Sequence, residues 1–274
     1  MDAEDNWLKI AKSLPAGYKV RVRCCRKDNS MLVSYDTKCY RAYCFRCGRQ
    51  EWKSVGVRTL AQIILDRRNL EAIKKNGVAM PQDFVDVVPA PHNLWYLAKG
   101  LTGEDMQQNG VGWSEQAQRI VLPVRLDGHL MALQLRAVHS DQKPKYLNPE
   151  GPSVTKAVFY PCGIEYSTET AFVVVVEDIL SAIKLNKAGI PAVSILGTNP
   201  TDARLNRILQ TSNTVLWWFD NDTAGRRGSQ QGKFLTELSG GIGIEIYTNE
   251  DPKCYDLQTI RDTVKGHLRD GISN

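Results

Sequence analysis

The chain contains 274 residues, of which 42% are hydrophobic and 24% are charged. These fractions match those of average globular proteins and exclude collagen-like, low-complexity and wholly disordered chains. The longest apolar runs, 171–176 and 215–219, are far shorter than the roughly 20 residues that a membrane-spanning helix needs. The acidic N-terminus lacks the apolar core of a secretory signal, so we expect a cytoplasmic protein that does not associate with a membrane.

The net charge of +5 is distributed unevenly along the chain. Residues 1–60 contain 13 Lys and Arg against 6 Asp and Glu, whereas the remaining 214 residues contain 22 and 24. This asymmetry predicts an N-terminal module that binds a polyanion and a second part whose acidic groups gather cations. A solvated basic face is the alternative interpretation of the N-terminal charge.

Cysteines cluster near the N-terminus. Five of the seven lie within residues 24–47, and without a secretory signal such a cluster indicates a metal site, with zinc as the expected ion. Residues 18–23 alternate like a strand, and residues 31–35 and 40–45 read as a hairpin that ends in Cys44-Phe-Arg-Cys47-Gly48. This order of elements is typical of a zinc ribbon.

The expected zinc ligands are Cys24, Cys25, Cys44 and Cys47. Cys24 and Cys25 are adjacent and do not form the usual second C-x-x-C pair, so the identity of the third and fourth ligands stays open at this point. Cys44 and Cys47 flank a tight turn and fit two corners of a zinc tetrahedron. Cys39 lies on the same strand as Cys44 but roughly 16 Å along it, so we exclude it from the site. For Cys39, and for the isolated Cys162 and Cys254, we expect small buried hydrophobic side chains.

Basic and aromatic side chains alternate along the same segment, a composition suited to following phosphates and stacking on unpaired bases. The basic ones are Arg21, Arg23, Arg26, Lys27, Arg41, Arg46 and Arg49, and the aromatic ones are Tyr35, Tyr40, Tyr43 and Phe45.

The middle of the chain begins with a helix and continues with strands. Residues 59–75 have apolar positions at helical spacing, and the proline-containing segment 81–91 is the expected linker. Residues 119–125 and 129–136 read as strands joined by a turn at Asp127-Gly128. We therefore expect a β-rich middle portion.

From residue 170 onward, apolar strands alternate with helix-like segments. The strands are rich in Val, Ile and Trp and show no polar alternation, which indicates a parallel sheet covered by helices on both faces.

Four acidic residues follow strands of this predicted sheet. Glu177 closes the first strand, Asp220 and Asp222 close a later one, and Asp251 follows the last. Ligands of open α/β sheets collect at the carboxyl ends of strands, and carboxylates that converge there need a hard divalent cation. The sequence predicts a magnesium site held by Glu177, Asp220 and Asp222 and suited to phosphoryl transfer. The alternative for Asp222 is a cap on the following helix.

These acidic residues resemble the TOPRIM domain of DnaG-type primases, topoisomerases, small nucleases and recombination mediators. The similarity rests on Glu177 after a strand, Gly197-Thr198 after the next, and Asp220-x-Asp222-x-Ala224-Gly225 after a third. The chain departs from the family pattern at Asp178 and Ser181, where a glycine and an aspartate are usual.

The segment before the TOPRIM region resembles the basic subdomain of bacterial and bacteriophage primases. It contains Leu135-Arg136 and Pro144-Lys-Tyr-Leu-Asn148, followed by Lys156. Together with the zinc ribbon, the resemblance covers nearly the whole chain. It implies an α/β TOPRIM fold beside an α+β basic subdomain and a small β zinc ribbon. The corresponding division is 1–55 (zinc ribbon), 56–90 (helix and linker), 91–167 (basic subdomain) and 168–274 (TOPRIM and C-terminal helix).

The resemblance implies a DNA primase that synthesises short RNA primers on single-stranded DNA from ribonucleoside triphosphates, with zinc and magnesium or manganese as cofactors. Glu177, Asp220 and Asp222 then hold the catalytic ion, Asp251 is a further catalytic acid, and Arg136, Lys145 and Lys156 contact template or nucleotide. For Lys156, an ordinary solvated lysine is nearly as good an interpretation. If the chain is phage-encoded, it works in the cytoplasm of the bacterial host.

Two other classes share parts of this pattern. Recombination mediators combine a four-cysteine zinc site with TOPRIM but act without catalysis, and TOPRIM nucleases use the same carboxylates. The chain has no G-x-x-x-x-G-K-[ST] phosphate loop, so we expect a separate replicative helicase as partner. We expect that helicase to dock near the helical segment 257–268, for which packing on the sheet is the alternative.

Overall fold

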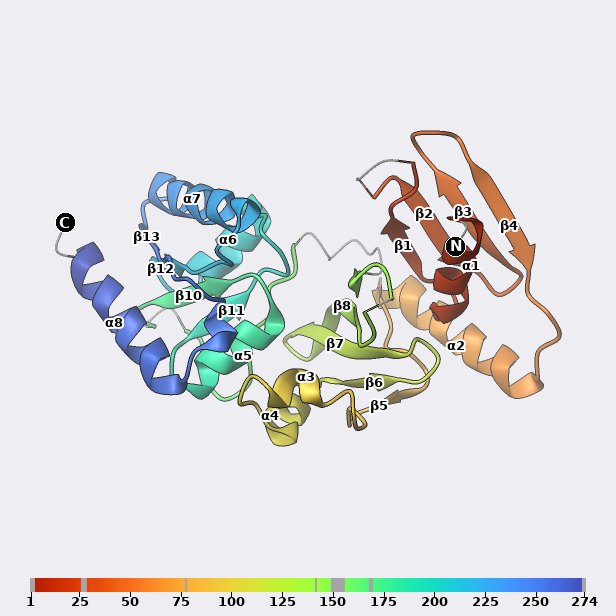
Figure 1. Ribbon diagram of the computed structural model, residues 1–274, viewed down its shortest axis with the longest axis horizontal. Helices are drawn as coiled ribbons and strands as arrows, with labels where there is room; N and C mark the ends of the chain where they lie inside the picture. Colours follow the sequence, from red (N-terminus) through yellow and green to blue (C-terminus); the bar gives the residue numbers. More distant parts are fainter. Residues whose placement is uncertain are drawn as a thin grey trace. The chain divides into compact units, whose positions relative to one another are not determined.

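The computed structural model describes residues 3–25, 29–76, 78–140, 142–148, 156–167 and 170–272 (Figure 1). Arg26 and Lys27 of the predicted basic segment therefore lie outside the described residues. Two compact units are present: the first comprises residues 1–92 and 110–154, and the second comprises 93–109 and 155–274. The finer division into four parts stays a prediction. Within the described ranges, no helix combines the length and apolarity needed to cross a bilayer.

A helix and a four-stranded antiparallel sheet begin the first unit. The elements are α1 (Ala3–Ser13), β1 (Lys19–Val22), β2 (Met31–Tyr35), β3 (Cys39–Cys44) and β4 (Gln50–Ser54), with strands in the order β1-β2-β3-β4. Val20, Val33 and Ala42 face one way across three paired strands and are buried, and α1 packs against β2 and β3. The predicted first strand and hairpin are confirmed.

The edge strand β4 was not expected from the sequence. All five of its side chains are at least partly exposed, so the apolar alternation that marks a half-buried strand is missing. Its pairing is nevertheless continuous from Tyr43↔Gln50 to Cys39↔Ser54. After β4 the chain enters α2 (Leu60–Asn76), which coincides with the helix predicted over 59–75.

A five-stranded antiparallel sheet completes the first unit. Its strands are β5 (Phe84–Val85), β6 (Gly112–Ser114), β7 (Arg119–Leu126), β8 (His129–Ala137) and β9 (Tyr146–Leu147), in sequence order. The predicted turn between β7 and β8 is present, since Asp127 and Gly128 have φ values of 50° and 77°, as a two-residue hairpin turn requires. Part of the segment expected to be a linker forms β5 instead, because Gly112 has no side chain and Phe84 packs directly over it.

The second unit is an α/β fold, as predicted. It contains α3 (Leu94–Leu97), α4 (Gly103–Gln108), β10 (Val173–Val176), α5 (Ile179–Lys187), β11 (Ala192–Ser194), α6 (Asp202–Leu209), β12 (Thr214–Trp217), α7 (Thr223–Leu238), β13 (Ile242–Glu245), η2 (Pro252–Cys254) and α8 (Leu257–Ile272). The four strands are parallel and lie in the order β11-β10-β12-β13. Helix α5 packs against α8 and α6 against α7, so one pair covers each face of the sheet (Figure 1).

Glycines allow α7 to lie directly on β12. A methyl group at Gly228 would collide with the backbone carbonyl of Thr198, and one at Gly232 would overlap the indole ring of Trp217. Trp217 is fully buried, and its Nε1 donates a hydrogen bond of 3.1 Å to Thr236 Oγ1 one turn further along α7. Close packing of this helix therefore depends on the absence of side chains at these positions.

We predict that Gly232→Ala lowers the free energy of unfolding by about 1–3 kcal/mol, because the added methyl group overpacks the core against Trp217. Gly266→Ala is the matched control, since Gly266 lies in α8 with open space around its Cβ position; we expect it to be neutral or to stabilise by up to about 1 kcal/mol. Urea denaturation measures both. Equal effects at the two positions would contradict the packing argument.

Candidate functional site

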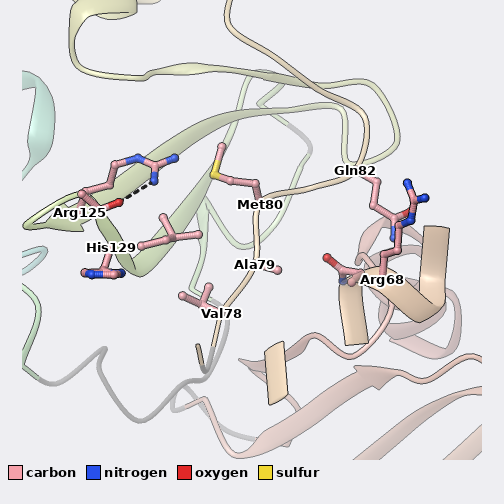
Figure 2. A pocket seen from close by; sticks show the side chains of 10 residues that line it. Arg68, Val78, Ala79, Met80, Gln82, Arg125 and His129 are labelled. Atoms are coloured by element: carbon pink, nitrogen blue, oxygen red, sulfur yellow. Dashed lines mark hydrogen bonds between the residues drawn. The ribbon is translucent and has the colours of Figure 1, made fainter. Parts of the chain in front are cut away.

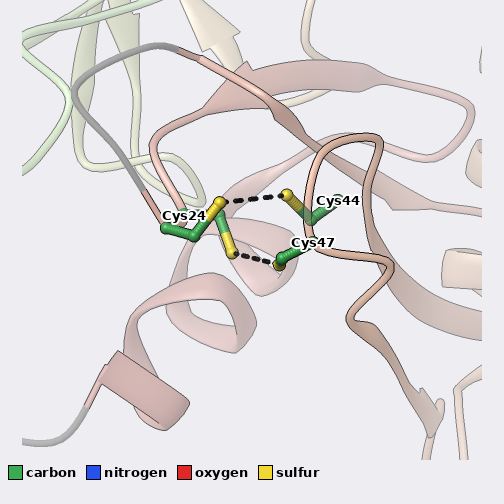
Figure 3. A group of neighbouring side chains, drawn as sticks. Cys24, Cys44 and Cys47 are labelled. Carbon is green, nitrogen blue, oxygen red and sulfur yellow. Dashed lines mark hydrogen bonds between the residues drawn. The ribbon is translucent and has the colours of Figure 1, made fainter.

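The four predicted zinc ligands come together in the first unit. Cys24 and Cys25 follow β1, Cys44 ends β3, and Cys47 lies in the turn after it (Figure 3). Their Sγ atoms all lie within 4.8 Å of one another, with Cys24–Cys47 at 3.7 Å and Cys25–Cys44 at 3.9 Å. Tetrahedral zinc with bonds of about 2.3 Å separates its sulfur ligands by about 3.8 Å. The residues present therefore fit a zinc ion.

The surrounding backbone supports the thiolates. Gly48 has a φ of 72°, and its N–H donates to the carbonyl of Cys44 at 3.0 Å, which closes the turn. Hydrogen bonds from the backbone N–H of Cys47 and from Ser30 lower the pKa of Cys44 to about 6. Burial and the neighbouring thiols raise the pKa of Cys24. A bound zinc ion would keep all four cysteines in the thiolate form, because zinc coordinates thiolates and releases their protons.

The remaining cysteines lie elsewhere. Cys39 is buried, as expected, and it contacts Arg41 Nε at 2.9 Å rather than the cluster. Cys162 and Cys254 are exposed, so the expectation of buried hydrophobic side chains is wrong for both. Each lies in a turn or short helix outside the sheet, where apolar neighbours do not surround it.

The predicted acidic site lies in the second unit, at the point where the strand order reverses. From β10 the chain passes through α5 to β11 on one side, and it later returns through α6 to β12 on the other side of β10. Glu177 follows β10 and Asp220 follows the neighbouring β12, so both lie at the carboxyl ends of adjacent strands. The chain leaves these two strands in opposite directions along the sheet. Such switch points are where open α/β sheets form their ligand crevices.

Glu177 and Asp220 are in direct contact. The backbone N–H of Asp220 donates to Glu177 Oε1 at 2.9 Å, and Gly225 packs so closely that a Cβ there would lie 2.7 Å from the same oxygen. Asp222 caps α7, since its Oδ1 accepts a hydrogen bond of 2.7 Å from the N–H of Gly225. The alternative interpretation of Asp222 as a helix cap is thus confirmed, and its role toward a metal ion stays a prediction.

Asp251 is paired with a lysine that the sequence reasoning missed. Lys253 Nζ lies 2.7 Å from Asp251 Oδ2 and 2.9 Å from Asp178 Oδ2. Asp178 also caps α5, accepting from the N–H of Ser181 at 3.1 Å and from its hydroxyl at 2.8 Å. The two residues that depart from the TOPRIM pattern, Asp178 and Ser181, therefore belong to one hydrogen-bonded network with Lys253. The available signal was a lysine two residues after the predicted acid Asp251, in the segment between β13 and α8.

Protonation of the acidic residues follows from burial and from this pairing. Burial, followed by the charge of Asp220, raises the pKa of Glu177 to about 7. Burial also raises the pKa of Asp220 to about 6, assisted by Asp251 and Asp178 and opposed by Lys253. Burial alone would raise the pKa of Asp178 too, but Lys253 and the hydrogen bonds from Ser181 lower it below its usual value.

The carboxylates of Glu177 and Asp220 suit a hard divalent cation, but they do not form a complete set of ligands by themselves. In the described part of the chain, only the four cysteines form a group of three or more side chains placed closely enough to hold a metal ion. No described Lys or Arg lies within 4.0 Å of the carboxylates of Glu177 or Asp220, which repel each other. Mg²⁺ prefers oxygen ligands, and it would neutralise two adjacent carboxylates that have no ion pair.

Two of the three predicted basic contacts lie together in the first unit. Arg136 on β8 and the exposed Lys145 approach the ring of Tyr146 on β9, at 5.9 Å and 5.7 Å from its centroid. The buried Arg119 donates to the carbonyls of Leu135 and Pro144 at 3.2 and 3.0 Å and so holds this segment. Lys156 lies in the second unit and is exposed.

A separate hollow of about 410 Å³ in the first unit contains none of the predicted site residues (Figure 2). Arg68 and Gln82 stand on one side of it, and Arg125 and His129 stand on the other. The guanidinium of Arg125 donates a hydrogen bond of 3.3 Å to the carbonyl of Gly128, within the β7–β8 turn. This hollow brings no acid and base into contact, so we assign it no role in catalysis.

Comparisons with known proteins agree with this geometry. Residues 174–258 match the Toprim-like family. The DNA primase of Thermotoga maritima is 36% identical over 117 residues, which are 40% of this chain and 20% of that protein. The DNA primase of Pseudomonas aeruginosa is 31% identical over 189 residues, which are 60% of this chain and 28% of that protein.

A solved structure of the zinc-binding and RNA polymerase domains of Aquifex aeolicus primase has a TM-score of 0.55 and 17% identity, covering 100% of this chain and 85% of that one. The similarity in sequence and fold confirms the resemblance to DnaG-type primases and the predicted fold class. The chain spans less than a third of the length of the two curated relatives.

We predict that Cys47→Ser reduces bound zinc from one equivalent to near zero, because three thiolates leave one corner of the tetrahedron unfilled. Cys39→Ser should retain one equivalent, since Cys39 lies outside the cluster. Elemental analysis of the purified proteins measures zinc content. Loss of zinc in both variants would exclude the four-cysteine ligand set.

We predict that Glu177→Gln stabilises the protein at pH 8 but not at pH 4. With a pKa of about 7 in place of 4.5, folded Glu177 keeps a proton that the unfolded chain releases, so wild-type stability falls as pH rises through this window. Gln stays neutral, and the gain should reach about 1–2 kcal/mol after solvent screening is allowed for. Urea denaturation of zinc-loaded protein without added magnesium tests this. A difference independent of pH would refute it.

Proposed function

We propose that this chain is a DNA primase that synthesises short RNA primers on single-stranded DNA by magnesium-dependent nucleotidyl transfer. The observation that carries the proposal is the unpaired carboxylate couple Glu177–Asp220 at the switch point of a Toprim-like sheet. It occurs in a chain that also carries a four-cysteine cluster and a basic antiparallel sheet. The basic sheet between the cysteine cluster and the Toprim-like sheet favours a primase over a recombination mediator, and the cysteine cluster and the segment around Lys145 favour a primase over a nuclease.

Glu177 and Asp220 would hold the divalent ion, with Asp222 and Asp251 as further acids. When bound, Mg²⁺ or Mn²⁺ supplies charge stabilisation at the α-phosphate and a lowered pKa for the attacking 3′-hydroxyl. The chain's own part is to aim the carboxylates, since burial favours their protonated forms and the divalent ion would favour the ionised ones. The N–H of Asp220 fixes Glu177 Oε1, and the cap on α7 fixes the turn from Asp220 to Gly225.

Arg136, Lys145 and Tyr146 form a basic and aromatic group suited to nucleic acid or triphosphate. Charged donors neutralise phosphate oxygens, and a tyrosine ring offers a stacking face for a base. Arg119 positions them, since its buried guanidinium binds carbonyls at the start of the segment that carries Lys145. Lys156 would add a further positive charge from the second unit.

The solvent face of the ribbon sheet is suited to reading single-stranded template. Strand alternation puts Arg21, Arg41, Tyr43 and Trp52 on the face opposite the buried Val20 and Ala42. Trp52 is 74% exposed, and the guanidinium of Arg21 stacks 4.8 Å from the ring of Phe45, which is 56% exposed. Exposed aromatic rings among cations bind unpaired bases by stacking.

A separate helicase is the proposed protein partner. The segment predicted to receive it forms most of α8, whose Ile260 and Val264 are fully buried and whose Arg261 donates to the carbonyl of Ala188. That face of α8 therefore packs within the second unit. Among the described residues of α8, the opposite, charged face includes the exposed Asp262 and Lys265 and is available to a partner.

We predict that Asp220→Asn abolishes primer synthesis, with a loss of about a hundredfold or more, because several kcal/mol of charge stabilisation depend on this carboxylate. The assay measures incorporation of labelled ribonucleotides on a library of single-stranded DNA templates with Mg²⁺. Asp202→Asn, at an exposed position in the first turn of α6, is the matched control and should keep full activity.

Products that persist in Asp220→Asn at the wild-type level, with contaminating polymerase excluded, would refute the proposal. Binding of single-stranded DNA without any incorporation by the wild type, with helicase present, would favour the non-catalytic mediator. Degradation of the template that requires Asp220 would favour the nuclease.

A further inference from the structure

Lys253 occupies an unusual place among the carboxylates of the second unit. Its side chain is only 17% exposed, and its ammonium contacts both Asp178 and Asp251 within 2.9 Å. Asp178 lies directly after Glu177 in sequence, and Asp251 follows β13 at the same edge of the sheet. One cation therefore joins acids from two different strand ends.

This arrangement is fixed from both sides. Lys253 lies in η2, where Pro252 is buried and the N–H of Cys254 donates to the carbonyl of Asp251 at 2.8 Å. Helix η2 packs against α5, whose first turn is capped by Asp178. Ser181 binds Asp178 through both its N–H and its hydroxyl. The ion pairs are thus part of the packing of two elements and not a contact between free surface side chains.

We propose that Lys253 is a built-in cation of the acidic crevice, a positioning residue that takes the place of a second metal ion and leaves the Glu177–Asp220 couple to bind a single divalent ion. This inference rests on the proposed magnesium site. The ammonium of Lys253 forms ion pairs with Asp178 and Asp251, and its charge also opposes the rise that burial causes in the pKa of Asp220. Glu177 and Asp220 form no ion pair within 4.0 Å with a described Lys or Arg, so they are the carboxylates left to bind an exchangeable cation.

The charge arrangement explains why the second ion is excluded. A divalent ion that approached Asp178 or Asp251 would have to displace Lys253 from two short ion pairs and would be repelled by its charge. Removal of that charge leaves two partly buried carboxylates uncompensated beside Glu177 and Asp220. A second divalent ion is then the simplest source of compensation.

The test counts bound Mn²⁺ on the zinc-loaded full chain, by titration calorimetry and by electron paramagnetic resonance, without nucleotide or template. We expect one Mn²⁺ in the wild type, lost in Asp220→Asn. Lys253→Met should bind two, the first about tenfold more tightly, and Asp251→Asn in that background should return the count to one. Lys253→Arg keeps the charge and should stay at one.

An unchanged count and affinity in Lys253→Met would overturn the proposal, as would two Mn²⁺ ions in the wild type. If Lys253→Met folds poorly, refolding with Mn²⁺ is compared with refolding at equal ionic strength in NaCl. Recovery with Mn²⁺ alone supports the proposal, and failure in both contradicts it, because a divalent ion should then replace the missing charge.

Failure of the proposed function is distinguishable from failure of this inference. If the wild type binds no Mn²⁺ that Asp220→Asn removes, the proposed magnesium site itself is wrong. If such an ion binds but Lys253→Met gains none, only the role of Lys253 is wrong, and primer synthesis by the wild type is unaffected by that result.

Discussion

Repulsion among carboxylates at the carboxyl edge of the parallel sheet is the constraint on which the second unit depends. Five acidic side chains follow three strand ends: Glu177, Asp178, Asp220, Asp222 and Asp251. Asp222 is exposed and the other four are partly buried. Burial of a carboxylate without compensation is costly, and the chain treats these residues in different ways. Asp178 and Asp251 bind Lys253, Asp222 binds the first turn of α7, and Glu177 and Asp220 remain protonatable near neutral pH. Glu177 and Asp220, which have no ion pair within 4.0 Å with a described Lys or Arg, lie at the switch point, where open α/β sheets form their ligand crevices.

Helix geometry serves the same purpose. Asp178 and Asp222 cap α5 and α7, so the N-termini of both helices point toward the crevice, where their dipoles favour negative charge. Helix α7 can begin this close to the sheet only because Gly225 lacks a side chain beside Glu177 and Asp220. Further along, Gly228 and Gly232 keep the same helix in contact with Phe219 and Trp217. The glycines of α7 are thus as much a part of the site as the acids, because they set the distance between helix and strand.

Much of this arrangement is predictable from the sequence, and the rest fails for identifiable reasons. The apolar runs at β10 and β12 and the alternation at β2 are local patterns, so these predictions succeed. The structure also brings the four predicted cysteines together, and their role as zinc ligands stays a prediction. Strand β4 is missed because its stability comes from pairing with β3 and not from its own burial. Lys253 is missed because a lone lysine after a strand is ordinary until the fold brings Asp178 beside it, 75 positions away in sequence. Interactions between distant segments are the part that no local pattern encodes.

The two metal-related sites differ in how much the protein supplies before an ion arrives. At the ribbon, four sulfur atoms already stand at the spacing of a zinc tetrahedron, so the ion completes a closed structural site. At the acidic crevice, Lys253 forms ion pairs with Asp178 and Asp251, whereas Glu177 and Asp220 have no ion pair within 4.0 Å with a described Lys or Arg. An open position is what an exchangeable catalytic ion needs, since nucleotide oxygens must share its coordination sphere. The departure from the TOPRIM pattern at Asp178 and Ser181 is therefore compatible with a metal site. Lys253 neutralises the additional carboxylate of Asp178, and Ser181 donates a hydrogen bond to it. In the proposed arrangement, the exchangeable cation then binds at Glu177 and Asp220.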